Sequence, residues 1–265
     1  MKFMAGFFIS DLRRALGSAG FFLACLITIL IWVVSTLDLL PIPDETVLTI
    51  YENGNVGQMQ ILMPAVAALP YGTAFSDEWR SRYFRLQLLR GNVIEWLLSK
   101  FLVAILCGAL AIGCGGILFA LLVSLSHSAL PPADMATNII ENIRSNGQAT
   151  SLLRAENIWL YLLACTGFRM LAAMMWAGVA LAISIYVPSR FYAVLSPFLL
   201  SVLLRSFSDW VGIPYNWQLN AIVRGETMIK DAGRAYAFAL ARYGPYILLC
   251  AGVFLWHGKR RVCNA

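Results

Sequence analysis

The thirty residues from Leu97 to Ser126 contain a single charged side chain, Lys100. About 20 apolar residues are enough for a helix to cross the ~30 Å hydrocarbon core of a bilayer. Similar runs recur along the chain, which is 60% hydrophobic and only 13% charged over its 265 residues. Because a soluble domain carries about 25% charged residues, this composition excludes most soluble enzymes, nucleic-acid-binding proteins and disordered proteins. It predicts a polytopic membrane protein.

The apolar runs predict an all-α fold with six transmembrane helices in one transmembrane domain, residues 1–265. A membrane β-barrel needs alternating segments of about ten residues, whereas these runs are continuous. The expected spans are Ala19–Leu37, Gln58–Phe75, Leu97–Ser126, Asn157–Val187, Phe191–Phe207 and Ala235–Trp256. The third span also has a stripe of small residues, which predicts close packing against another helix: Ala104, Gly108, Ala111 and Gly115.

The distribution of Lys and Arg predicts the orientation, since cytoplasmic segments are enriched in both. The N-terminus, Ser76–Lys100, Val187–Arg190 and the C-terminus together hold twelve cations and four acids. The segments on the other side hold seven cations and ten acids. We therefore expect both termini to be cytoplasmic.

Two segments outside the spans have compositions typical of a membrane interface. Residues 1–15 mix phenylalanines with charges, which suits an interfacial helix, although a frayed N-terminus would look similar. Residues 208–234 combine aromatic residues with Gly212 and Pro214, which suits a re-entrant element on the outer face. An ordinary outer loop lying on the headgroups is the alternative there.

Residues 76–92 are unusual for a short cytoplasmic loop. Glu78, Arg82 and Arg85 recur at helical spacing, and Trp79, Tyr83 and Leu86 occupy an adjacent face. Such a helix can bind anionic lipid or press into a groove on a cytoplasmic partner. A helix that only orients the protein at the interface is the third possibility.

The stretch Phe75–Lys100, ending in Glu-Trp-Leu-Leu-Ser-Lys from Glu95, resembles the membrane subunits of type-2 ATP-binding-cassette exporters. The resemblance extends at pattern level to the six spans and implies a type V exporter-like fold. It implies that residues 76–92 form the coupling helix, with Glu78 at the acidic position and Arg82 where members often have Gly. The residues implied in coupling to an ATPase are Glu78, Trp79, Arg80, Arg82, Arg85 and Arg90.

The resemblance also implies the partners. These are a cytoplasmic ATP-binding-cassette ATPase, a second permease subunit in a homo- or heterodimer, and the lipid bilayer, but no nucleic acid. The sequence has no G-x-x-x-x-G-K-[ST] motif, so ATP and Mg²⁺ would be bound by the partner and no cofactor by this chain. We find no catalytic constellation and no metal motif, which predicts that the chain is not an enzyme.

Three arginines fall within predicted spans: Arg169, Arg205 and Arg242. They lie roughly 21–27 Å from the expected cytoplasmic helix ends at 1.5 Å per residue, which places all three in the outer half of the membrane. They can line a translocation path that holds an anionic group. The alternatives are snorkelling to the outer headgroups or pairing with Glu156, Asp209 or Asp38.

Together these features predict the permease subunit of an ATP-driven exporter in a bacterial inner membrane. The short outer loops favour a peptide, drug or lipid-like cargo. One alternative is a stand-alone secondary transporter or channel, which would need coupling-ion acids within spans. The other is a membrane scaffold or immunity protein.

Overall fold

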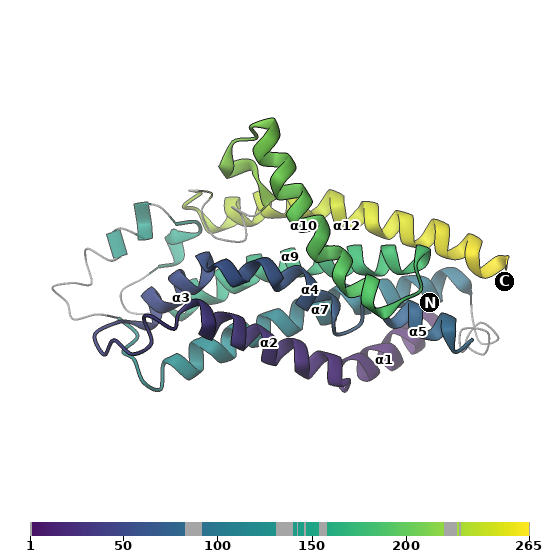
Figure 1. The fold of residues 1–265 in the computed structure, drawn as a ribbon, viewed down its shortest axis with the longest axis horizontal. Helices are drawn as coiled ribbons and strands as arrows, with labels where there is room; N and C mark the ends of the chain where they lie inside the picture. The colour runs from purple at the N-terminus through teal and green to yellow at the C-terminus, as the bar shows by residue number, and fades with distance from the viewer. Residues whose placement is uncertain are drawn as a thin grey trace.

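The computed structural model describes residues 2–82, 92–130, 140–141, 143–145, 147–153, 158–219, 227 and 229–264 (Figure 1). All regular secondary structure in these ranges is helical. Four helices are long and apolar enough to cross a membrane, or five if a bent pair is one span. The all-α, multi-pass prediction is therefore confirmed at this level.

The centre of the bundle is formed by α7 (Val93–Val123) and α9 (Trp159–Tyr186), the most deeply buried of the long helices. Asn92 caps α7 by accepting a hydrogen bond from the Ile94 N–H. The predicted small-residue stripe lies in this core: a Cβ on Gly108 would meet the Ala67 carbonyl at 2.7 Å, and one on Gly115 would meet Thr28 at 2.6 Å. The stripe therefore serves close helix packing, as predicted.

The N-terminal segment forms α1 (Lys2–Leu16), which is followed by α2 (Ala19–Ser35). The Ser18 side chain caps α2 by accepting from the Phe21 N–H, and the two helices meet at a 52° bend. Asp11 of α1 is buried against Ser99 of α7. The N-terminal helix is thus packed on one face against the bundle, which its composition did not indicate.

The predicted second span, Gln58–Phe75, is not one helix. The chain instead forms α3 (Val47–Val56), a 3₁₀ turn (Gln58–Leu62), α4 (Met63–Ala68) and α5 (Ala74–Arg80) in succession. Gly57 has an extended ψ that ends α3, and Gly72 lies too close to the Ala68 carbonyl for a Cβ. These short pieces run along the bundle from one end to the other (Figure 1).

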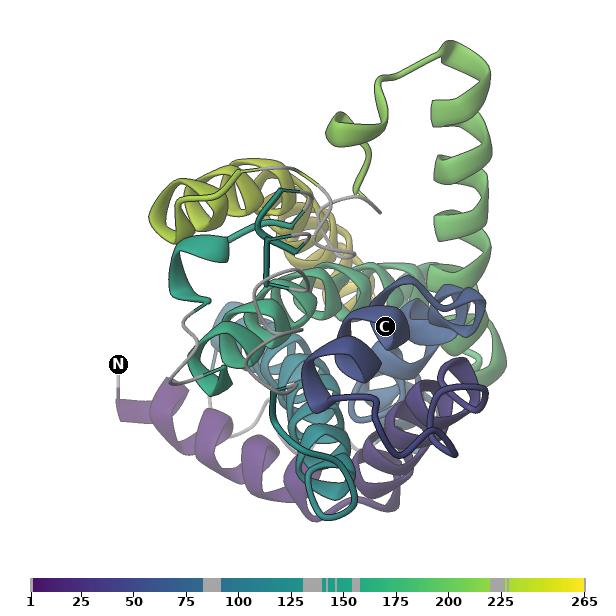
Figure 2. The same ribbon diagram turned by 90° about the vertical axis from the view of Figure 1, so that its left-hand side faces the viewer.

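The two last long helices are α10 (Arg190–Val211) and α12 (Ala232–Cys263). Only 17% of the apolar window of α10 and 22% of that of α12 are buried, against 78% for α9. Figure 2 shows α10 standing away from the other long helices. The exposed side chains are large and apolar, and they include Leu203, Phe207, Leu248 and Leu249. Lipid or another protein must cover these faces.

The two chain termini lie at one end of the bundle, together with α5 and the start of α10 (Figure 1). This end carries the exposed cations Arg80, Arg82, Lys259 and Arg260. We call it the basic end. The common location agrees with the predicted grouping of the cationic segments.

Gly212 in the left-handed conformation (φ 74°) ends α10 away from the basic end (Figure 1), and a short 3₁₀ turn (Tyr215–Trp217) follows. The Tyr243 hydroxyl donates to the Leu219 carbonyl, which ties this segment to α12. Residues 220–226 and 228 of the predicted re-entrant element lie outside the described residues.

Candidate functional site

Two groups of charged residues stand out in the bundle. The first is at the basic end, where α5 meets its neighbours. Glu78 is only 4% exposed, and its carboxylate lies 2.8 Å from the Lys100 Nζ of α7 and also accepts from Arg14 of α1. Asp11 lies 3.4 Å from the same Lys100 Nζ. We call Asp11, Arg14, Glu78 and Lys100 the buried ion cluster, although only the first, third and fourth of these side chains are buried and that of Arg14 is 46% exposed.

The buried ion cluster is neutral, with two cations and two carboxylates. The hydroxyl of Tyr71 lies between its two cations, accepting from Arg14 at 2.9 Å and from Lys100 at 3.4 Å. Burial raises the pKa of the Tyr71 phenol far above its usual range, so this residue stays uncharged. Because buried charges are tolerated only when paired and hydrogen-bonded, the cluster fixes the relative positions of α1, α5 and α7.

Further contacts join α5 to the remaining long helices. Asp77 pairs with Arg190 at the start of α10, with 2.5 Å between Oδ1 and Nε. The guanidinium of Arg261, near the end of α12, lies 4.6 Å from the ring centroid of Trp79. Phe75 is fully buried and packs edge-on against Phe254 of α12. A helix of seven residues thus contacts the ends of α1, α7, α10 and α12.

The sequence-predicted coupling residues therefore separate into two sets. Glu78 and Trp79 face neighbouring helices, whereas Arg80 and Arg82 are exposed at the basic end. Arg82 has a left-handed backbone (φ 55°) directly after the end of α5, which explains why glycine suits this position. Arg85 and Arg90 lie outside the described residues.

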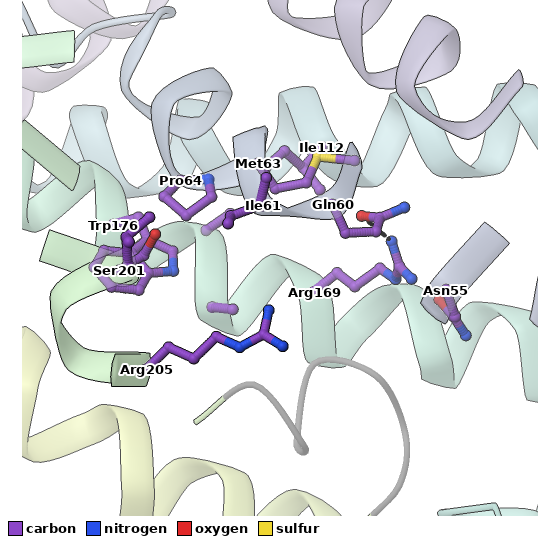
Figure 3. A pocket seen from close by; sticks show the side chains of 13 residues that line it. Asn55, Gln60, Ile61, Met63, Pro64, Ile112, Arg169, Trp176, Ser201 and Arg205 are labelled. Atoms are coloured by element: carbon purple, nitrogen blue, oxygen red, sulfur yellow. Dashed lines mark hydrogen bonds between the residues drawn. The ribbon is translucent and has the colours of Figure 1, made fainter. Parts of the chain in front are cut away.

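The second group lies deeper in the bundle and contains the three arginines predicted from sequence. A cavity of about 70 Å³ is lined by residues of α4, α7, α9 and α10, among them Arg169 and Arg205. Figure 3 shows these two side chains reaching into it from α9 and α10. A second cavity of about 120 Å³ is lined by Arg205 and Arg242. The structure thus brings all three arginines to two adjoining cavities, which share Trp176, Ser201 and Arg205.

The three arginines differ in their surroundings. Arg169 is 4% exposed; its Nη1 donates to the Gln60 Oε1 at 3.1 Å, and its guanidinium lies 4.2 Å from the centroid of Trp32. Arg242 stacks on Trp217 at 4.4 Å. Arg205 is exposed. Among the residues that the structure describes, no carboxylate lies within 4.0 Å of any of the three.

The sequence offered three acids as alternative partners of the arginines, and the structure describes two of them. Asp209 accepts a hydrogen bond from the Gln218 amide, and Asp38 is exposed. Glu156 lies outside the described residues. Gln60, the residue that does bind Arg169, gave no signal in the sequence because it lies 109 positions away.

The buried ion cluster was also missed from sequence. In the sequence, Asp11 lies among the phenylalanines of residues 1–15 and Lys100 is the one charge of a long apolar run; such isolated charges are the signal that could have suggested a pair. No group of three or more potential metal ligands occurs in the described part of the chain. The comparisons with protein-family models, with curated proteins and with solved structures each gave no match.

Proposed function

We propose that this chain is the membrane-spanning subunit of an exporter driven by a separate ATPase that docks at the basic end. The observation that carries the proposal is the position of α5. Only the Arg80 end of this helix is exposed at the basic end, and the helix contacts the ends of α1, α7, α10 and α12. A partner that pushes on α5 would therefore move several long helices together.

The strength of these contacts differs, and this difference suggests how such a push would act. The buried ion cluster holds α5 to α1 and α7, and breaking a buried pair costs about 3–5 kcal/mol. The Asp77–Arg190 pair to α10 is largely exposed and contributes at most about 1 kcal/mol. A groove of about 870 Å³ is also lined by α5, the start of α10, the end of α1 and the start of α2. We infer that α10 shifts while α1, α5 and α7 move as one body.

The surface of the basic end suits an acidic partner. Arg80, Arg82, Lys259 and Arg260 are exposed there, and such charges increase the rate of association with a complementary surface. The finer membrane topology of the proposal has six crossings: the α1–α2 pair, the broken path Val47–Ala68, and the four long helices. A second copy or a related subunit would cover part of α10, and both termini would be cytoplasmic in a bacterial inner membrane.

Photo-crosslinking tests the proposal. A photoreactive amino acid in place of Arg80 should crosslink to a soluble ATPase that co-purifies with the chain. The matched control places the same amino acid at Arg234, which is exposed at the other end of α12, and should give no such product. Purification of an active transport complex without any ATPase would overturn the proposal.

A stand-alone transporter is the second candidate, and one observation favours it. Asp11 and Glu78 are buried carboxylates, the kind of group that ion-coupled transport uses. Both are neutralised by Arg14 and Lys100, however, which fits a fixed structural role. Transport that persists after ATP is depleted and stops when the proton gradient is collapsed would favour this candidate.

A further inference from the structure

Most of the buried polar atoms that lack a hydrogen-bond partner gather at one place. Six such side-chain atoms occur among the described residues, and four of them belong to Trp32, Asn55 and Arg169. They are the Nε and Nη2 of Arg169, the indole Nε1 of Trp32 and the Oδ1 of Asn55. Because buried polar groups are almost always satisfied in native proteins, this concentration indicates a missing partner.

The missing partner is expected to be an anion. Three of the four atoms are N–H donors, and two of these belong to a guanidinium that is always charged. Arg169 is 4% exposed and has no carboxylate within 4.0 Å among the described residues. A buried cation without a contacting counter-ion is costly; the Glu52 carboxylate offsets part of this cost from a distance, and an anion in the adjoining cavity would offset more of it.

The shape and lining of the two cavities indicate the rest of the molecule. The first cavity is also lined by apolar side chains, including Met63, Pro64 and Ile112. Arg205 lines both cavities, so a second positive charge faces the cavity that Arg169 lines (Figure 3). The two adjoining cavities enclose about 70 and 120 Å³, less than the roughly 300–1,000 Å³ of a pocket that encloses a whole drug-sized ligand, so they have room for an anionic group and the first carbons attached to it.

We propose that Arg169 and Arg205 bind the anionic head group of an amphiphile, a carboxylate or phosphate, whose first carbons lie against α4 and α7 and whose chain continues outside the cavities. The inference that this amphiphile is the cargo of an exporter rests on the proposed function. The inference that an anion binds here depends only on the cavity and the unpaired donors. The site can therefore be tested on the purified chain without any ATPase.

Quenching of tryptophan fluorescence by dibromostearate provides the test. Trp32 lies under Arg169 and Trp176 lines both cavities, so the quenching assigned to the site is the part lost in the variant Trp32→Phe, Trp176→Phe. This difference removes the background from exposed tryptophans such as Trp210 and Trp256. In a neutral maltoside detergent, we expect saturable quenching by the acid and at least tenfold weaker quenching by its uncharged methyl ester. Loss of one charge-assisted contact predicts at least about tenfold weaker binding for Arg169→Gln and for Arg205→Gln.

The controls make each outcome decisive. Arg234→Gln removes an exposed charge outside both cavities and should leave the affinity unchanged. Arg205 is exposed, so Arg205→Gln keeps the test valid if Arg169→Gln does not fold. Unchanged affinity in Arg205→Gln, or equal quenching by the methyl ester, would overturn the site.

Competition distinguishes the possible sources of the anion. Stearate without bromine should displace the probe, whereas inorganic phosphate at the same concentration should not. Equal displacement by inorganic phosphate would overturn the assignment of an amphiphile. Arginine-dependent binding of dibromostearate by a chain that never co-purifies with an ATPase would support this site while rejecting the exporter.

Discussion

Replacing Glu78 by glutamine should destabilise the protein far more than a similar change at the neighbouring residue Asp77. The substitution keeps the shape of the side chain but removes one of two carboxylates that neutralise the fully buried Lys100. Breaking a buried ion pair costs about 3–5 kcal/mol. We expect about 3 kcal/mol here, because Asp11 remains 3.4 Å from the Lys100 Nζ. At about 2–4 °C per kcal/mol for a chain of this size, Tm should fall by about 6–12 °C.

The control is Asp77→Asn on the same helix. Its partner Arg190 is 71% exposed, so this change should cost at most about 1 kcal/mol. Thermal unfolding in detergent, followed by a thiol-independent dye or by circular dichroism, compares the variants. The double variant Glu78→Gln, Lys100→Met removes one charge of each sign and should regain most of the lost Tm. If Glu78→Gln and Asp77→Asn unfold at the same temperature, the argument from burial is refuted.

Further predictions concern packing, backbone conformation and orientation. Gly108→Ala should lower the free energy of unfolding by about 1–3 kcal/mol, because the new Cβ would lie 2.7 Å from the Ala67 carbonyl. The control is Gly252→Ala, whose Cβ would have nothing within 4 Å. This change should be neutral or should raise the free energy of unfolding by up to about 1 kcal/mol. Arg82→Gly should raise the free energy of unfolding by up to about 1 kcal/mol, since φ is 55° there, and a lower Tm would contradict this. Cys263 is exposed at the basic end, so a membrane-impermeant maleimide should label it in inside-out vesicles and not in intact cells; the reverse pattern would show that the basic end faces outward.

Several features of the fold could be predicted from the sequence because they depend on local properties. The length and apolarity of α7 and α9 are properties of continuous segments, and a helix in a bilayer has to satisfy its backbone internally. The positions of Arg169, Arg205 and Arg242 along their helices follow from counting residues. The small-residue stripe on α7 likewise follows from helical spacing.

Other features were decided only by the tertiary structure. Sequence spacing does not determine which face of a helix meets which neighbour, so the pairing of Glu78 with Lys100 and Asp11 could not be predicted. The break of the predicted second span depends on where Gly57 and Gly72 meet surrounding backbone. The same holds for the convergence of three arginines on two cavities, because α9, α10 and α12 come together only through packing. The sequence by itself determined how far each charge lies along its helix, whereas the rotation and contact of helices decided which charges are paired and which face a cavity.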